Sequence, residues 1–259
     1  MKQLVDLFIN PQITADKIIS FIKTTVQNAG FSRVVVGLSG GLDSAVSCFL
    51  AAKALGRENV FVGLFPYGEL NREGLDDARL TIDKLSIPPK NVVFVDIKPL
   101  VDPLLTDHKM DNLRKGNMMV RMRMILLYDL SKKFNALVLG TENKSEYLLG
   151  YYTRFGDEAS DIEPIRHLYK AQVKQLAKHL GVPDKIINKN PTAGMWQGQT
   201  DERELGFSYE EADKILYLYT DLKESREEII KEGFKREVVE KVIRRLKANK
   251  FKHELPYTI

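Results

Sequence analysis

The sequence is poor in cysteine, with a single thiol among 259 residues. Cys48 cannot form a disulfide within the chain, and alone it cannot build a thiolate-ligated structural zinc site. It stands beside Val46 and Phe49 in a segment of helical periodicity, so we expect a buried core thiol. Because proteins without disulfides are typical of reducing compartments, we expect a cytoplasmic location.

Long apolar runs are also missing. No run reaches the length of about 18 residues that a membrane-spanning helix needs. The first residues, MKQLVD, lack the apolar core of a signal peptide. We therefore expect neither a membrane span nor a secretory leader. With 44% hydrophobic and 29% charged residues, the composition is that of a globular protein and excludes a mainly disordered chain.

The excess of positive charge is small. The 39 lysines and arginines outnumber the 35 acidic residues by four. This balance is compatible with an anionic ligand but is weak evidence for nucleic acid, and we expect no nucleic-acid partner. A basic stretch near the carboxyl terminus is more simply explained as the solvated face of a helix; it contains Lys241, Arg244, Arg245 and Lys247.

Apolar runs typical of strands alternate with segments of helical periodicity. Strands are expected at residues 33–38, 59–65, 91–97 and 136–140. Helices are expected at residues 3–29, 42–55, 70–85, 118–134, 169–180, 209–218 and 236–250. Continuous apolar strands indicate a parallel sheet covered on both faces. We predict one domain over residues 1–259 with an α/β fold, a doubly wound, mostly parallel sheet that carries a helical carboxy-terminal appendage beyond residue 191.

The turn after the first predicted strand contains the most informative motif. It consists of Gly37, Leu38, Ser39, Gly40, Gly41, Leu42, Asp43 and Ser44. Glycines let a backbone approach a ligand closely, and N–H groups at a helix amino terminus bind anions. The P-loop lysine is absent, and Asp43 would repel phosphates unless Mg²⁺ bridged them. The simpler alternative is a tight turn in which Asp43 and Ser44 cap the helix.

Further polar residues are expected at the same sheet edge. Thr141 and Glu146 follow the fourth predicted strand, so they can face the same crevice as Asp43, where two carboxylates could share one Mg²⁺. The alternative for Glu146 is a helix start, where acidic side chains are favourable. Arg121 and Arg123 lie in an apolar helix, where charge is costly unless paired. They either form structural ion pairs or recognise phosphate or carboxylate groups.

The order of the motifs resembles one family of enzymes. The sequence S-G-G-L-D-S at residues 39–44 resembles the pyrophosphate-binding loop of the N-type ATP pyrophosphatases. Later blocks resemble the NAD synthetase branch of that family: R-x-R-M-x-x-L-Y from residue 121, G-T-x-N-K-S-E from 140, G-D…D-I-x-P-I from 156, L-x-K from 168, P-T-A from 191 and D-E-x-x-L-G from 201. The resemblance spans residues 33–256 and implies an adenine nucleotide α-hydrolase-like fold.

The resemblance implies a role for individual residues. ATP is expected to contact residues 37–44 together with Thr141, Lys170 and Thr192, and Mg²⁺ to bind Asp43 and Glu146. Deamido-NAD is expected to contact Arg121, Arg154, Asp161, Phe251 and Lys252. The expected catalytic residues are Asp43, Lys170 and Asp157, the last as general base for ammonia. Two positions depart from the family pattern, since Arg154 stands where lysine is common and Phe251 precedes Lys252 where histidine is often found.

The implied activity is a ligase reaction that forms a C–N bond. ATP would adenylate the carboxylate of deamido-NAD, and ammonia would then displace AMP. Glutamine-dependent forms carry an added amidase domain with a nucleophilic cysteine, which we do not expect here. The resemblance also implies a homodimer. Two alternatives stay open at this point, another ATP pyrophosphatase such as a tRNA-modifying sulfur transferase, and a nucleotide-binding module without catalysis.

Overall fold

A computed structural model describes residues 5–105 and 110–254 of the protein. In these ranges the strands are β1 (Val34–Gly37), β2 (Val60–Leu64), β3 (Val92–Phe94) and β4 (Leu137–Val138). The longer helices are α1 (Pro11–Asn28), α2 (Leu42–Leu55), α3 (Arg72–Leu85), α5 (Asn112–Phe134), α7 (Lys170–Leu180), α10 (Tyr209–Leu216) and α12 (Arg236–Ala248). The shorter ones are α4 (Lys98–Val101), α6 (Lys144–Leu149), α8 (Asp184–Ile187), α9 (Asp201–Leu205) and α11 (Arg226–Lys231).

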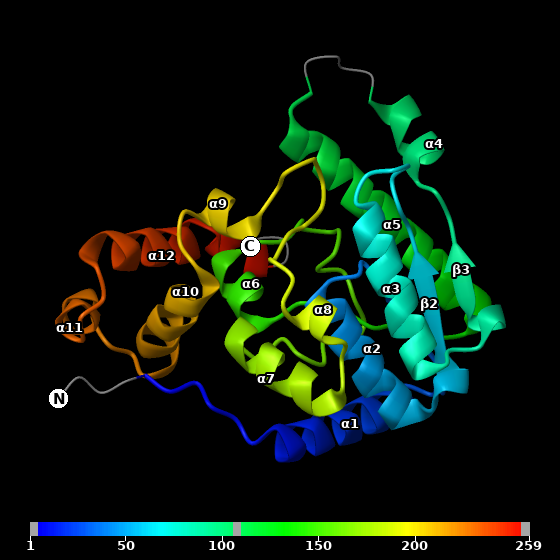
Figure 1. Ribbon diagram of the computed structural model, residues 1–259, viewed down its shortest axis with the longest axis horizontal. Helices are drawn as coiled ribbons and strands as arrows, with labels where there is room; N and C mark the ends of the chain where they lie inside the picture. Colours follow the sequence, from blue (N-terminus) through cyan, green and yellow to red (C-terminus); the bar gives the residue numbers. More distant parts are fainter. Residues whose placement is uncertain (1–4, 106–109, 255–259) are drawn as a thin grey trace, which may run out of the picture.

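The described strands form one parallel sheet in the order β3-β2-β1-β4. The register aligns Val34 with Val60 of β2 and with Leu137 of β4. Successive strands run from β1 outwards to β3, and β4 is then added on the other side of β1 (Figure 1). This reversal confirms the predicted doubly wound α/β fold.

Both faces of the sheet are covered. Val34 and Val36 point into a core formed with α1, α2 and α7, whereas Val35 points into a second core formed with α4 and α5. Alternate side chains therefore enter different cores, and each is fully buried. This is the physical reason why the strands are continuous apolar runs.

Two predicted helices begin elsewhere than expected. The helix predicted from residue 3 begins at Pro11, because Asn10 caps it through a hydrogen bond from the backbone N–H of Ile13 to its side chain, and proline favours the first helical position. Residues 3 and 4 lie outside the described ranges. The helix predicted from residue 118 begins at Asn112, capped by Asp111. Its first turns are polar, so the apolar pattern did not reveal them.

The predicted helical appendage is confirmed. Helices α10, α11 and α12 pack a third core against α6 and α7, at the side of the molecule away from β3 (Figure 1). A short π-helical segment, Tyr217–Asp221, continues α10. Through α6 and α7 the appendage contacts the elements that follow β4, which brings it next to the functional site. Within the described ranges, no helix has both the length and the apolarity that crossing a bilayer requires.

Candidate active site

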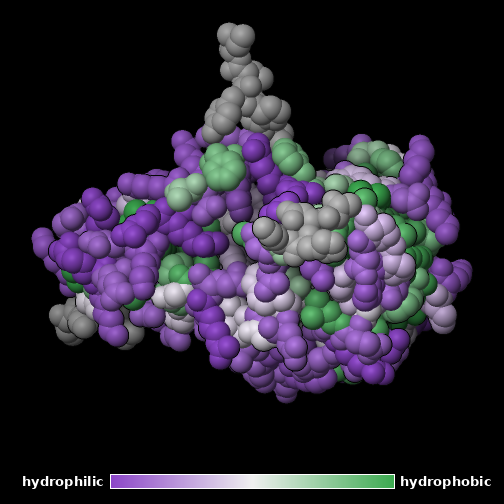
Figure 2. Space-filling view, turned by 90° about the horizontal axis from the view of Figure 1, so that it is seen from above, coloured by the Kyte–Doolittle hydropathy of each residue, from purple (hydrophilic) through white to green (hydrophobic). Residues whose placement is uncertain are grey.

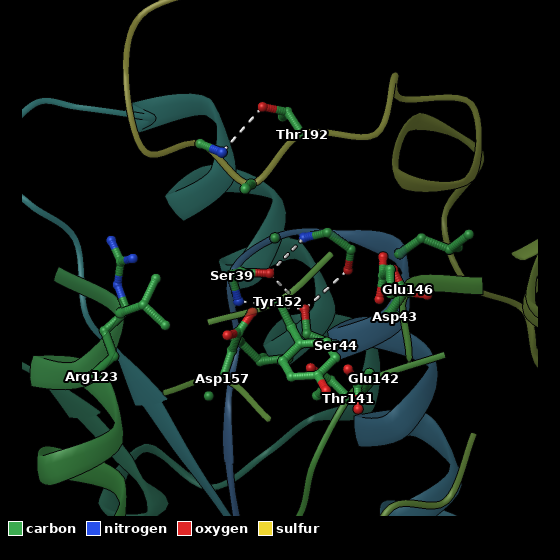
Figure 3. Close-up of a pocket in the computed structure, with 18 of the residues that line it drawn as sticks. Ser39, Asp43, Ser44, Arg123, Thr141, Glu142, Glu146, Tyr152, Asp157 and Thr192 are labelled. Carbon is green, nitrogen blue, oxygen red and sulfur yellow. Dashed lines mark hydrogen bonds between the residues drawn. The ribbon is translucent and has the colours of Figure 1, made fainter. Parts of the chain in front are cut away.

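A cavity opens at the carboxyl ends of β1 and β4 (Figure 3). Its walls come from the turn after β1, the turn after β4, the loop after α6 and the segment 189–195. The strand order reverses between β1 and β4, and ligands of doubly wound sheets bind where this reversal occurs. The sequence and the fold therefore indicate the same place.

All the residues expected to contact ATP or Mg²⁺ line this cavity. They are Gly37, Leu38, Ser39, Gly40, Gly41, Leu42, Asp43, Ser44, Thr141, Glu146, Lys170 and Thr192. The expected base, Asp157, lines it as well. The structure thus brings together side chains from the turn after β1, the turn after β4, the start of α7 and the loop before α9.

The glycine turn is held by its own serine hydroxyls. Ser44 Oγ donates to the carbonyl of Gly41 at 3.0 Å, and Gly41 N–H donates to Ser39 Oγ at 3.2 Å. The two hydroxyl oxygens lie 3.1 Å apart. Among the residues that the structure describes, no side chain caps the amino terminus of α2. Gly41 holds the cap position and Asp43 lies in the first turn, so the simple capping alternative does not describe this turn. The backbone amides of a helix's first turn favour an anionic ligand.

One glycine of the turn is required by close packing. Gly40 has φ +79°, and a Cβ placed on it would lie 2.0 Å from the carbonyl oxygen of Gly74 in α3. No side chain fits such a distance, and the positive φ adds strain for any other residue. Gly40 therefore lets the turn after β1 and the first turn of α3 touch through their backbones.

Lys170 joins the two carboxylates at the centre of the site. Its ammonium lies 2.6 Å from Asp43 Oδ2 and 3.0 Å from Glu146 Oε1. Asn143 donates to the other oxygen of Asp43 at 2.9 Å, and its own side chain caps α6. Lys170 is only 5% exposed. Ion pairs with two carboxylates are what permits a buried ammonium.

The two neighbouring carboxylates determine the protonation state of Lys170. Burial by itself lowers the pKa of Lys170, but the Asp43 and Glu146 carboxylates outweigh it and raise that pKa above its usual value. Lys170 is therefore a cation at neutral pH. Burial raises the pKa of the Glu146 carboxyl, and the Lys170 ammonium opposes that rise. With both carboxylates ionised, the three side chains carry one net negative charge.

The residues expected to contact deamido-NAD lie outside the cavity wall, and four of them form a second group. Arg121 donates to the carbonyl of Arg154 at 3.1 Å, and the Arg154 guanidinium lies 6.0 Å from the ring centre of Phe251. Lys252 donates to the carbonyls of Gly150 and Tyr152 at 2.6 and 2.8 Å. The carboxy-terminal residues thus hold the loop that lines the cavity.

Asp161 belongs to neither group. Its carboxylate accepts a hydrogen bond from Val138 N–H at 2.7 Å, and its own N–H donates to the Val138 carbonyl at 2.9 Å. In this structure Asp161 therefore anchors the segment after the loop to strand β4.

The sequence did not assign several residues that line the cavity. Arg123 lines it, whereas its neighbour Arg121 does not, and Arg123 Nε donates to the carbonyl of Phe65 at 3.0 Å. Asp201, which is 4% exposed, accepts hydrogen bonds from Tyr151 and from the N–H of Ala193. The signals were present, because Arg123 belongs to the arginine pair and Asp201 begins the D-E-x-x-L-G block.

The residues at the centre of the site fit a magnesium ion that arrives with phosphates. Asp43 and Glu146 supply hard carboxylate oxygens, and a bound cation would favour the ionised form of both, which with Lys170 leaves one uncompensated negative charge. Residues 5–105 and 110–254 contain no group of three or more histidine, cysteine, aspartate or glutamate side chains arranged to hold a metal. Mg²⁺ commonly takes only one or two protein carboxylates and completes its shell with phosphates and water.

The family model described as NAD synthase matches residues 14–256. The chain is 45% identical over 252 residues to the NH(3)-dependent NAD(+) synthetase of Chlorobium phaeovibrioides, covering 97% of this chain and 90% of that protein. Its fold is similar to the NH3-dependent NAD synthetase of Campylobacter jejuni, with TM-score 0.82, 32% identity and coverage of 97% and 100%. It is also similar to the NMN synthetase of Francisella tularensis, with TM-score 0.85, 32% identity and coverage of 97% and 99%. The chain belongs to the NAD synthase family.

Proposed function

We propose that the protein uses ATP and ammonia to convert deamido-NAD to NAD, releasing AMP and pyrophosphate. The observation that carries this proposal is the Asp43–Lys170–Glu146 group beside the glycine turn, at the reversal of the strand order. Backbone amides at the amino terminus of a helix suit phosphates, and a buried lysine next to them suits a reaction in which negative charge develops on a leaving group.

The first half-reaction is adenylation of the nicotinate carboxylate. A carboxylate oxygen attacks the α-phosphorus of ATP, a P–O bond forms, and pyrophosphate leaves with its bonding electrons. The turn amides and Lys170 stabilise that charge, and Asp43 and Glu146 hold the ammonium in position. Mg²⁺ bound at Asp43 and Glu146 would supply further neutralisation of the pyrophosphate. Thr141 and Thr192 are proposed as polar contacts to ATP from opposite walls.

The second half-reaction is amide formation. Ammonia attacks the adenylated carbonyl, the C–N bond forms, and the bond to the AMP oxygen breaks. A proton must leave the nitrogen, and Asp157 is the proposed acceptor. Asp157 lines the cavity, and the surrounding protein partly desolvates its carboxyl and raises its pKa, so its carboxylate is more basic than that of an ordinary aspartate. Its Oδ1 accepts from Thr153 N–H at 2.7 Å, which fixes its orientation.

We place deamido-NAD across the cavity and the group formed by Arg121, Arg154, Phe251 and Lys252. This group borders the loop that lines the cavity, and its cations are suited to the pyrophosphate of a dinucleotide. Arg154 offers a planar fork, which can form paired hydrogen bonds, where the family commonly has lysine.

The proposed nitrogen donor is ammonia. The only thiol, Cys48, is fully buried in the core between the sheet and α2, so it cannot serve as an amidase nucleophile. The same burial argues against a sulfur transferase that needs a reactive cysteine. A binding module without catalysis would need the glycine turn but would not need Glu146 and Lys170 at its centre.

A turnover assay tests the proposal. Purified protein with ATP, Mg²⁺, deamido-NAD and ammonium should yield NAD, AMP and pyrophosphate in equal amounts. Glutamine in place of ammonium should give no NAD. Equal rates with glutamine would contradict the ammonia assignment, and ATP binding without turnover would support a binding module.

A second candidate product is NMN, because one similar structure is of an NMN synthetase. An NMN synthetase would amidate the same nicotinate carboxylate, but its substrate, nicotinate mononucleotide, lacks the adenylate half of deamido-NAD. Comparison of kcat/KM for deamido-NAD and for nicotinate mononucleotide decides between them. We expect the dinucleotide to be preferred, because the second cationic group lies beyond the cavity where the extra half would extend.

We also propose that the protein is a homodimer. Several large apolar side chains of β3, α4 and α5 are exposed, namely Phe94, Leu100, Leu113, Ile125 and Tyr128. Figure 2 shows hydrophobic residues gathered on the side of the molecule where these elements lie in Figure 1. Exposed apolar surface of this kind marks interaction sites. Light scattering at micromolar concentration should give about twice the chain mass, and a monomer would contradict the proposal.

The single-domain organisation, the cytoplasmic location and the absence of a nucleic-acid partner stay predictions from the sequence. A filter-binding measurement with tRNA would test the last of them.

A further inference from the structure

Glu142 stands out among the residues that line the cavity. It follows Thr141 in the turn after β4 and is only 5% exposed. Its Oε2 lies 2.9 Å from Arg166 Nη2, whereas no side chain or backbone group in the described ranges forms a hydrogen bond with its Oε1. A buried carboxylate oxygen without a donor is costly, so it indicates a donor that arrives from outside the protein.

A second buried polar atom nearby also lacks a partner. Tyr152 lines the same cavity, and its buried hydroxyl forms no hydrogen bond within the described residues. Glu142 acts electrostatically on the Tyr152 phenol, and both residues line the cavity that Figure 3 draws. The phenol oxygen can accept a hydrogen bond, as can the free carboxylate oxygen.

The surroundings of Glu142 are short of positive charge. Arg166 is shared between Glu142 and Glu163, at 2.9 and 3.2 Å. Asp157 stands on the same cavity wall and acts on Glu142 as a further like charge. The Arg166 guanidinium is therefore divided between two carboxylates. The Lys252 ammonium acts on Glu142 and Asp157 as well. Carboxylates still outnumber these two cations, and a further small cation would relieve their repulsion.

We propose that Glu142 and the Tyr152 hydroxyl form the binding site for the ammonium ion. This inference rests on the proposed function and names the place where its nitrogen substrate binds. Ammonium is a small cation with four N–H donors, and it matches an acidic recess with unpartnered acceptors. Glu142 and Asp157 then face the ion from two parts of the same cavity wall.

The proton balance gives Glu142 a direct part in the reaction. Ammonium transfers one proton to the Glu142 carboxylate, and the nitrogen lone pair that is released attacks the adenylated carbonyl. The nitrogen loses a second proton to Asp157 as the amide forms, and AMP leaves with the electrons of the C–O bond. Burial raises the pKa of Glu142 to about 9, and a cation bound beside it favours the ionised form. The Glu142 carboxylate that faces the ammonium ion is therefore a stronger proton acceptor than an exposed one.

The decisive experiment is Glu142→Gln in the full chain, assayed with ATP, Mg²⁺ and deamido-NAD while ammonium chloride is varied. Glutamine keeps the size and removes the charge. We expect the KM for ammonium to rise about tenfold or more, because a charge-assisted hydrogen bond is lost, while the KM for ATP and deamido-NAD change by less than about threefold. Glu142→Asp should recover part of the loss.

Glu163→Gln is the matched control, because Glu163 pairs with the same Arg166 but does not line the cavity. Its KM for ammonium should change by less than about threefold. An equal rise in both variants would mean that the Arg166 network acts structurally, and would overturn the proposal. If Glu142→Gln does not fold, Tyr152→Phe provides the same test and should raise the KM for ammonium by at least about threefold.

Pyrophosphate exchange separates this inference from the proposed function. Labelled pyrophosphate should enter ATP when deamido-NAD is present and ammonium is absent. If the wild-type protein shows neither exchange nor NAD formation, the proposed function fails. If it shows both and Glu142→Gln leaves the response to ammonium unchanged, only the ammonium site is wrong.

Discussion

The ammonium of Lys170 lies 2.6 Å from Oδ2 of Asp43, although 127 residues separate them in the chain. Asp43 is in the first turn of α2 and Lys170 is the first residue of α7. The two helices pack side by side on one face of the sheet, so their amino termini reach the same sheet edge. This ion pair links the glycine turn at residues 37–44 to the L-x-K motif at residues 168–170.

The Asp43→Asn variant should fold but lose turnover. The amide keeps the shape yet removes one of the two charges that hold Lys170, and it removes a candidate ligand of Mg²⁺. We expect kcat to fall by about 100-fold or more, in the range of other losses of charge stabilisation in active sites. Steady-state kinetics over a range of Mg²⁺ concentrations measures this. Asp76→Asn is the control, since Asp76 is exposed on α3; unchanged kinetics in Asp43→Asn would contradict the assigned role.

The Gly40→Ala variant should be far more damaging than Gly30→Ala. Both glycines have φ close to +80°, so the backbone strain is alike, about 1 kcal/mol. A Cβ at Gly30 meets no atom within 4 Å, whereas one at Gly40 meets the Gly74 carbonyl. Chemical denaturation should therefore show a loss larger than about 2 kcal/mol for Gly40→Ala only, and its KM for ATP should rise. Equal losses would show that the close contact is unimportant.

The Arg121→Ala variant should weaken deamido-NAD binding more than ATP binding. Arg121 is exposed on α5 and reaches the loop at Arg154, away from the glycine turn. Its loss should leave the thermal midpoint nearly unchanged, since exposed interactions contribute about 1 kcal/mol or less. Comparison of the KM values for the two nucleotides is the measurement. An equal rise in both would favour a structural role for Arg121.

The Asp213→Asn variant should lower both stability and kcat. Asp213 is fully buried in α10 and accepts hydrogen bonds from Ser145 Oγ and from Ala171 N–H, and Ser145 Oγ accepts from Lys170 N–H. The asparagine side chain at this position would point its NH₂ group at Ser145 Oγ or at Ala171 N–H, and two facing donors should lower the free energy of unfolding by about 1 to 3 kcal/mol. Glu210→Gln in the same helix is the control, with an expected loss below about 1 kcal/mol because its ion pair is exposed. Urea denaturation and steady-state kinetics measure both effects.

Cys48 should be unreactive in the native protein. Burial raises the pKa of its thiol to about 12 from an ordinary value near 9, so the native state holds the proton when the unfolded state loses it. Stability should therefore be unaffected by this thiol below pH 9 and should fall by about 1.4 kcal/mol for each pH unit above it, until about pH 12. Alkylation at pH 8.5 should proceed only in denaturant. Labelling of the native protein at the rate of the unfolded chain would contradict this.

Local sequence determined the strands, most of the helices and the glycine turn. Val34 and Val36 enter one core and Val35 enters the other, so every residue of the strand must be apolar. A continuous apolar run is visible in the sequence without any knowledge of the fold. Two motifs directly follow predicted strands of a parallel sheet, now β1 and β4. Because the carboxyl ends of parallel strands lie at the same edge of a sheet, the sequence predicted that the two turns lie close together. The start of α1 at Pro11 was missed because helical spacing continues through residues that precede the cap.

Only the tertiary structure decided which residues of each motif reach the cavity and which distant residues they contact there. It brought Lys170 between Asp43 and Glu146 and separated Arg123 in the cavity from Arg121 on the surface. It also buried Glu142 with one oxygen that accepts no hydrogen bond from residues 5–105 or 110–254. Hydropathy patterns report which face of an element is covered, since that depends on neighbours within a few residues. They do not report which distant side chain covers it, because contacts across 100 residues or more are set by how the helices pack on the sheet.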